Sequence, residues 1–306
     1  MVRSLHVGII DVVWILLAYM LAQTAAVLTV GRLGDMWGRK RLYVSGFALF
    51  TVMALIAGFA STTWLLIALR VLAGIGGALM VANSGAIVTD AFPRRELGVA
   101  LGINAMVIAV GSAVGPVLGG WLTSFGWQWV FWFNVPLGLL GTVWSYFVLH
   151  DPARHRASQR LDWTGNALFV IAMTGLLLML SMGGIEGWTS PLVVAGGVAF
   201  VVGAPLFVLV ELRVSDPLLD FKLFKNRLFT IANVAQLING TSRMGMLFLL
   251  IFYFQGPAQK DAVTTGILVL PLAGVLFLVS GPSGWISDHI GSRIQRLQAC
   301  YSPPSG

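Results

Sequence analysis

The chain has 306 residues, of which 57% are hydrophobic and only 10% are charged, and its net charge is +7. Soluble globular proteins carry about 25% charged residues, so this composition excludes a soluble protein and predicts an all-α polytopic membrane protein. The cations lie in short segments between apolar runs, which argues against a nucleic-acid partner. The single cysteine, Cys300, excludes an intramolecular disulfide framework, and the four scattered histidines lack metal-ligand spacing. We expect no cofactor and no metal site.

Nine apolar segments are each long enough to cross a lipid bilayer, which requires about 20 helical residues. In chain order they are residues 12–30, 42–60, 64–88, 98–123, 129–149, 163–183, 191–211, 229–254 and 263–282. The predicted fold is therefore a bundle of about nine transmembrane helices.

The loops between these segments alternate in charge. Fifteen of the 19 lysines and arginines fall in every second loop, beginning with residues 31–41. Cationic loops remain on the cytoplasmic side of a membrane. We therefore expect a multi-pass protein of the cell (plasma) membrane, with cytoplasmic basic loops and Met1 outside.

The stretch Gly31–Arg41 combines three glycines, one aspartate and four cations, and a weaker copy lies at Gly284–Arg293. Eight predicted spans separate the two copies, whereas a six-helix repeat would place six there. Residues 163–211 are therefore expected to form two extra central spans. The final residues have no apolar periodicity, so we interpret the chain as shortened at both ends. The alternative, that nine helices are the complete protein, stays open.

Three further motifs follow along the chain. Residues 66–78 carry Arg70 followed by Gly74, Gly76 and Gly77, and residues 127–138 form a tryptophan-rich stretch that ends in Asn-Val-Pro-Leu-Gly. Between them lies the sequence Gly-Ser-Ala-Val-Gly-Pro-Val-Leu-Gly-Gly, which contains Gly111, Gly115, Pro116, Gly119 and Gly120.

Together with Gly31–Arg41 and the Leu-Asp-Trp-Thr-Gly sequence at 161–165, these motifs resemble the major facilitator superfamily, and within it the fourteen-span drug:proton antiporters. The resemblance implies that the family's first span is absent. The expected parts are then residues 1–149 as an N-terminal half without its first helix, 150–162 as a cytoplasmic linker, 163–211 as the extra spans, 212–293 as the start of a C-terminal half, and 294–306 as an atypical tail.

Arg70 lies at the middle of a predicted span, where an arginine costs roughly 2.5–3.5 kcal/mol. It persists there only if it faces a cavity or a partner. The resemblance implies that it controls the protonation of a nearby carboxylate, although no Asp or Glu lies well inside a predicted span. The alternative is that Arg70 hydrogen-bonds to neighbouring helices and only holds the bundle together.

Two other sites are expected to move during transport. Gly111, Gly115 and Gly119 recur every four residues and line one helix face, and Pro116 permits a kink. The resemblance implies that this segment, with Gly120, sets the direction of antiport, and the alternative is simple tight packing. The resemblance also implies a gating loop in which Gly31, Asp35, Gly38 and Arg39 form a latch with Asp90, although Asp90 is alternatively only a helix-end charge.

Several polar residues in the predicted spans are candidates for lining a substrate cavity. Each Asn and Gln among them is alternatively an ordinary interhelical hydrogen-bonding group, and Arg243 alternatively extends its cation to the outer membrane interface. They are Gln23, Asn83, Asn104, Gln236, Asn239 and Arg243.

The function that these observations favour is secondary active export of amphipathic or cationic small molecules in exchange for protons, by alternating access in the lipid bilayer. We expect that the protein is not an enzyme, because the spans lack clustered catalytic groups and the chain lacks a phosphate-binding loop. We also expect a monomer. The alternatives are a transport-inactive fragment of such an exporter, or a solute or nutrient porter of the same superfamily.

Overall fold

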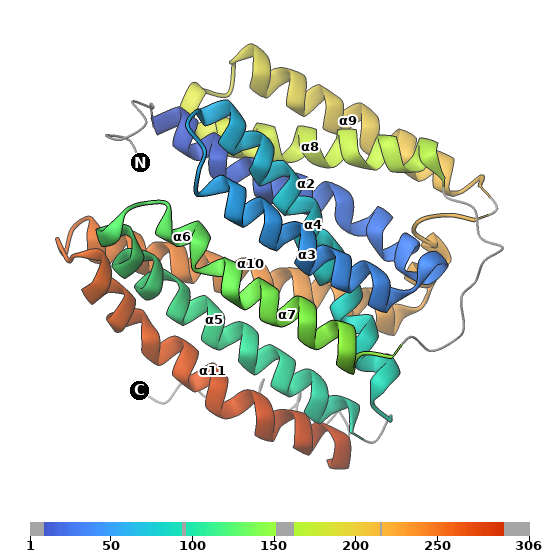
Figure 1. The fold of residues 1–306 in the computed structure, drawn as a ribbon. Coiled ribbons are helices and arrows are strands. Elements are labelled where there is room, and N and C mark those ends of the chain that lie inside the picture. The colour runs from blue at the N-terminus through green and yellow to red at the C-terminus, as the bar shows by residue number, and fades with distance from the viewer. Residues whose placement is uncertain (1–8, 94–95, 151–161, 215, 291–306) are drawn as a thin grey trace, which may run out of the picture. The chain divides into compact units, whose positions relative to one another are not determined.

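The computed structural model describes residues 9–93, 96–150, 162–214 and 216–290. The described residues contain helices at all nine predicted spans, which confirms the all-α class (Figure 1). The helices are α2 (Ile9–Trp37), α3 (Arg39–Ala57), α4 (Thr63–Ala91), α5 (Leu97–Phe125), α6 (Trp129–Trp132), α7 (Asn134–Val148), α8 (Trp163–Glu186), α9 (Pro191–Glu211), the 3-10 helix η1 (Phe221–Lys225), α10 (Arg227–Gln255) and α11 (Ala262–Ile290).

The lengths and apolar composition of these helices define the membrane spans. Seven spans in the described residues meet both criteria, with α6 and α7 together forming one of them. An eighth is α5, if its two segments Leu97–Ser112 and Val117–Phe125, which are bent by 42° relative to each other, form one span. The ninth predicted span lies in α11, where the apolar part Thr264–Ser280 is shorter. The described chain is thus a multi-pass helical protein.

The predicted loop 31–41 is largely helical. α2 continues to Trp37, α3 starts at Arg39, and only Gly38 separates them, with a φ of 102°. That left-handed conformation favours glycine because it has no Cβ. The sequence prediction was wrong about these helix ends, because the polar residues mark where the apolar surface stops rather than where helical hydrogen bonding stops.

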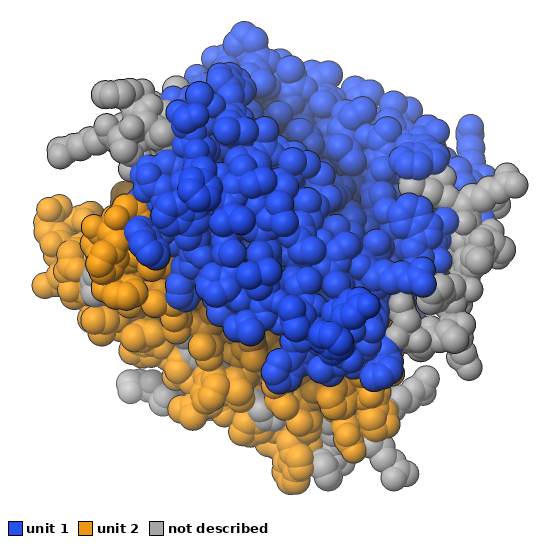
Figure 2. Space-filling model, in the orientation of Figure 1, with its two compact units in different colours: residues 1–84, 127–231 blue, residues 85–126, 232–306 orange. Residues whose placement is uncertain are grey.

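The described chain forms two compact units, residues 1–84 with 127–231 and residues 85–126 with 232–306 (Figure 2). The boundaries of the predicted N-terminal half, extra spans and C-terminal half remain predictions. Residues 151–161 of the predicted linker and the tail 294–306 lie outside the described residues.

Within the first unit, glycines allow α3 and α4 to approach closely. A Cβ built on Gly46 would lie 2.9 Å from the carbonyl oxygen of Gly76, and one on Gly76 would lie 2.9 Å from the backbone nitrogen of Phe50. Small residues at such contacts are typical of membrane helices, which associate through close van der Waals packing. This contact fixes α4 against its neighbour and so positions the residues that α4 carries.

The helices α8 and α9 of the first unit lie side by side as a hairpin (Figure 1). Gly175 and Gly196 face each other, because a Cβ on either would come within 2.8 Å of the carbonyl oxygen of the other. Asp162 caps the start of α8 by accepting hydrogen bonds from the backbone N–H groups of Thr164 and Gly165, at 3.0 and 2.9 Å.

In the second unit, α5 and α11 lie side by side along much of their lengths (Figure 1). Their close contact is at Gly266, where a Cβ would lie 2.5 Å from Cγ2 of Val117. Val117 begins the second segment of α5, just after the bend. The Gly111–Gly120 motif lies on α5, so it belongs to this pair of helices.

Candidate functional site

The first unit partly buries the side chain of Arg70 among groups from two other helices. Its Nε donates a hydrogen bond of 3.2 Å to the carbonyl oxygen of Ile15 on α2. Its guanidinium carbon lies 4.9 Å from the centre of the Tyr19 ring and 5.6 Å from the centre of the Phe131 ring on α6. A cation within about 6 Å of an aromatic face is attracted to the ring electrons. Arg70 is thus held by one carbonyl and two aromatic rings.

Small residues on α4 bring Tyr19 to Arg70. A Cβ on Gly74 would lie 2.5 Å from the carbonyl oxygen of Tyr19, and a Cβ on Gly77 would lie 2.6 Å from its hydroxyl oxygen. A larger side chain at Gly74 would push the α2 backbone away from α4, and one at Gly77 would displace the ends of the Tyr19 and Gln23 side chains. The glycines that follow the arginine in the sequence therefore set the distance between the two helices at this site.

An apolar core packs next to the Arg70 site and includes two of its contacts, Ile15 and Phe131. Ile15, Leu66, Leu69, Trp127 and Phe131 form one buried cluster. The rings of Trp127 and Phe131 pack edge-to-face with centres 6.0 Å apart, a favoured arrangement for aromatic pairs. Phe131 therefore contacts the core with part of its ring and faces the Arg70 cation as well.

Sequence reasoning identified Arg70 but missed Ile15, Tyr19 and Phe131. The four-residue spacing of Ile15 and Tyr19 places both on one face of α2, which is the only signal that the sequence contains. Among the described residues, the ion pairs of carboxylates do not include Arg70. A role of Arg70 in controlling the protonation of a carboxylate remains a prediction.

The predicted gating residues belong to two different units. Asp35 and Arg39 form an ion pair in which Nη2 and Nε of Arg39 lie 2.8 and 3.1 Å from Oδ1 of Asp35. Gly38 separates their helices, and a Cβ on Gly31 would have open space around it. Asp90 is exposed near the end of α4, in the second unit. The latch between Asp90 and this stretch remains a prediction.

The predicted antiporter motif lies on α5, across its bend. The bend of 42° falls between Ser112 and Val117, in the segment that contains Pro116. A Cβ on Gly111, Gly115 or Gly119 would meet no described atom within 4 Å. Gly120, the last residue of the motif, is partly buried. The described residues therefore leave room beside the glycine face, and its role in antiport remains a prediction.

Two of the predicted cavity residues, Gln23 and Asn83, lie in the first unit. Asn83 is only 1% exposed; its Nδ2 donates a 2.9 Å hydrogen bond to the carbonyl oxygen of Leu79, and its Oδ1 lies against Gly34. Nε2 of Gln23 would lie 3.1 Å from a Cβ on Gly77. Gln23 therefore occupies the contact between α2 and α4 near the Arg70 site, and Asn83 occupies a contact between the same helices more than three turns further along α4.

The other predicted cavity residues lie in the second unit. Asn104 is partly buried on α5. On α10, Gln236, Asn239 and Arg243 are exposed, as are most of the described residues of that helix. Their contribution to a substrate cavity remains a prediction.

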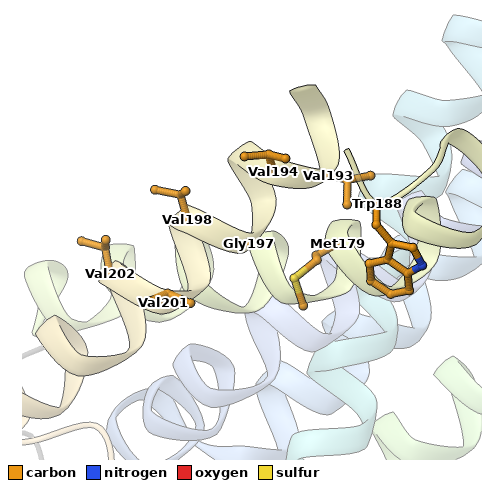
Figure 3. Close-up of a pocket in the computed structure, with 8 residues that line it drawn as sticks. All are labelled: Met179, Trp188, Val193, Val194, Gly197, Val198, Val201 and Val202. Carbon is orange, nitrogen blue, oxygen red and sulfur yellow. The ribbon is translucent and has the colours of Figure 1, made fainter. Parts of the chain in front are cut away.

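A separate apolar pocket of about 360 Å3 lies on the α8–α9 hairpin. Figure 3 shows that it is lined by valines from α9, Met179 from α8 and Trp188 from the turn between them. None of the predicted site residues lines it. The lining is almost entirely apolar, so this pocket offers apolar contact rather than polar chemistry.

The described helices define a class of protein, the polytopic α-helical membrane proteins that hold a charged side chain inside a helix bundle. The chain belongs to the Major Facilitator Superfamily, because the sequence pattern of that family matches residues 1–302. This finding confirms the resemblance that the motifs indicated.

Curated relatives are transporters by name. The chain is 31% identical over 297 residues to multidrug resistance protein Stp of Mycobacterium tuberculosis, covering 96% of this chain and 55% of Stp. It is 31% identical over 290 residues to the tetracenomycin C resistance and export protein of Streptomyces glaucescens, covering 94% and 54%. It is also 31% identical over 281 residues to riboflavin transporter RibZ of Clostridioides difficile, covering 92% and 60%. The chain spans about half the length of the curated relatives it matches.

Proposed function

We propose that the protein is a secondary active transporter that exports amphipathic or cationic small molecules in exchange for protons. Two relatives whose names refer to multidrug resistance or to export support the direction and the substrate class. In this proposal two halves rock around a central cavity, so that the cavity opens to one side of the membrane at a time. Transport rather than catalysis also agrees with the family.

The observation that carries the proposal is the placement of Arg70. A permanent cation inside apolar helices costs about 2.5–3.5 kcal/mol at mid-membrane, and the Ile15 carbonyl and the Tyr19 and Phe131 rings offset that cost without neutralising the charge. The remaining positive charge favours the deprotonated form of any acid that comes near it. When a conformational change brings a carboxyl group close to such a cation, the pKa of the carboxyl group falls and it releases its proton.

The proposed topology places the protein in the plasma membrane as a monomer, with its basic segments in the cytoplasm and Met1 outside. The positive-inside rule supports this orientation. In the same proposal, the Asp35–Arg39 stretch and Asp90 close the cytoplasmic side. The polar residues Gln23 and Asn83 at the contacts between α2 and α4 contribute to the substrate path together with those of α5 and α10.

Everted membrane vesicles that contain the protein test the proposal. We expect a cationic fluorescent dye to accumulate inside the vesicles when their lumen is acidified, because proton efflux then drives dye uptake. The measurement is dye fluorescence with and without a protonophore. Accumulation that is unchanged by the protonophore, or equal to that of vesicles lacking the protein, contradicts proton-coupled export.

A porter for a single nutrient is the second candidate, and similarity to riboflavin transporter RibZ favours it. Riboflavin is tested in the same vesicles and in right-side-out vesicles. Uptake of riboflavin without any movement of cationic dyes would support the nutrient porter and contradict multidrug export.

Replacement of Gly115 with valine separates function from packing. Because a Cβ on Gly115 meets no described atom within 4 Å, we expect normal expression and folding of Gly115→Val. Export of the dye should nevertheless be lost, at least about tenfold, if α5 must move against a neighbour during transport; a tenfold change corresponds to about 1.4 kcal/mol. Gly266→Val, which would clash with Val117, serves as a packing control that lowers the yield of folded protein. Full export by Gly115→Val would contradict a role of Gly115 in transport.

A further inference from the structure

A cluster of charged side chains lies where α2, α8 and α9 of the first unit meet, away from Arg70. Four buried side-chain polar atoms in the described residues lack a hydrogen-bond partner. Three of them belong to this cluster, namely Nε of Arg32, Oδ2 of Asp162 and Oε1 of Glu211. Buried polar atoms are almost always paired, so these three atoms from three elements leave hydrogen-bonding capacity that an added proton can satisfy.

The two carboxylates point at the same place. A Cβ built on Gly165 would lie 2.8 Å from Oε1 of Glu211 and closer still to Oδ2 of Asp162. The second oxygen of each carboxylate already has a partner. Oδ1 of Asp162 caps α8, and Oε2 of Glu211 accepts a hydrogen bond of 3.3 Å from the backbone N–H of Leu219. Only the two oxygens that converge near Gly165 are left for another contact.

The packing of α2 on α8 holds the cluster closed. Thr29, one helical turn before Arg32, donates a hydrogen bond to Asn166, next to Gly165. Glu211 is only 3% exposed, and the side chain of Arg32 is 16% exposed. Water is therefore largely excluded from the carboxylate of Glu211.

The charges around Glu211 do not balance if every group is ionised. The charged groups that interact with it are Asp162 before α8 and Arg32 from α2. Asp216 after α9 adds a third carboxylate, with its Oδ1 3.7 Å from Nη2 of Arg32. One cation then stands against three anions. A buried, unpaired carboxylate is costly, and two carboxylates that share a site do not both ionise readily.

We propose that Glu211 and Asp162 form a proton-binding pair, in which protonated Oε1 of Glu211 donates a hydrogen bond to Oδ2 of Asp162 while Arg32 offsets part of the remaining negative charge. One added proton supplies the missing donor and removes one charge. On release, the O–H bond of Glu211 breaks, the proton passes to water, and the carboxylate remains. The bond between the start of α8 and the end of α9 is then lost. This assignment does not depend on export and concerns a site separate from Arg70.

Infrared spectroscopy of the purified full chain tests the pair directly. We expect a protonated-carboxyl band at about neutral pH, where a free glutamate with a pKa of about 4.3 would be ionised. Glu211→Gln should remove this band. The matched control is Glu186→Gln on the same hairpin, whose exposed carboxylate accepts a hydrogen bond from Ser190, and it should leave the band unchanged. Identical bands in the wild type and Glu211→Gln would overturn the proposal.

Thermal melting as a function of pH provides a second readout. The folded form holds a proton that the unfolded form releases, so folded stability should fall as the pH rises above the unfolded value of about 4.3. We expect the melting temperature of the wild type to drop by at least about 2–4 °C between about pH 5 and pH 8. Glu211→Gln and Asp162→Asn should flatten this dependence; asparagine caps a helix about as well as aspartate, so α8 is preserved.

Two outcomes of the melting experiment contradict the assignment. An equal pH dependence in the wild type, Glu211→Gln and Asp162→Asn would show that the pair does not bind the proton. A melting temperature that rises with sodium chloride but not with potassium or choline chloride at constant pH, in the wild type alone, would assign the site to a sodium ion instead.

Discussion

Arg70→Ala should abolish proton-driven export while leaving the protein folded in the membrane. The substitution removes a hydrogen bond to Ile15 and two ring contacts, with Tyr19 and Phe131. A desolvated cation–ring contact contributes about 2 kcal/mol. Removal of an arginine from mid-membrane returns about 2.5–3.5 kcal/mol. The second effect offsets most of the first, so the protein should still fold even though the charge that acts on protons is lost.

Dye transport in everted vesicles measures this loss, and we expect the initial rate to fall at least about tenfold. Arg70→Lys keeps the positive charge but not the planar guanidinium that stacks on rings, so it should retain part of the activity. Arg213→Ala, at an exposed arginine beyond α9, is the control and should transport normally. Undiminished export by Arg70→Ala would show that Arg70 only holds α2, α4 and α6 together.

Gly74→Val should destabilise the first unit strongly, whereas the same substitution at Gly85 on α4 should not. Its Cβ would lie 2.5 Å from the carbonyl oxygen of Tyr19 and 2.9 Å from the Cβ of Ala22. A backbone carbonyl cannot rotate away as a side chain can, so α2 must move. Overpacking costs about 1–3 kcal/mol, which corresponds to a lower melting temperature by about 2–4 °C per kcal/mol. The movement also separates the Tyr19 ring from Arg70.

The melting temperature in detergent, with size-exclusion chromatography for the folded fraction, measures this effect. Gly85→Val is the matched control on the same helix, because a Cβ there has no described atom within 4 Å. Gly85→Val changes helix propensity by the same amount as Gly74→Val but introduces no clash. Equal melting temperatures for the two variants would mean that the contact between α2 and α4 is not tight in solution.

The sequence predicts the helices well because their apolar character is local. It also singles out Arg70, since a cation inside an apolar run is visible without any structure. The partners of Arg70 could not be predicted, because Tyr19 and Phe131 reach it only through the register between helices, and that register depends on glycine contacts such as Gly74 with Tyr19. Composition contains no information on which residues face each other across two helices.

The ends of the helices and the cluster at Glu211 escaped prediction for different reasons. The basic residues after Gly31 made the sequence look like a loop, although arginine, lysine and leucine are good helix formers. Glu211 lies at the end of the predicted span 191–211, and the sequence does not distinguish it from other charges at helix ends. Its burial depends on α2 and on the start of α8, which are more than forty residues away in sequence.

The one-residue connection at Gly38 limits how α2 and α3 move relative to each other. Any change in the angle between the two helices must come from rotation about the φ and ψ bonds of this residue and its immediate neighbours. Asp35 in α2 and Arg39 in α3 are joined across the connection, and the backbone N–H of Gly38 donates to the carbonyl oxygen of Gly34 at 3.1 Å. A tilt of one helix must therefore break the Asp35–Arg39 ion pair or carry the other helix with it, so conditions that screen this pair, such as high salt, should increase the angular freedom between α2 and α3.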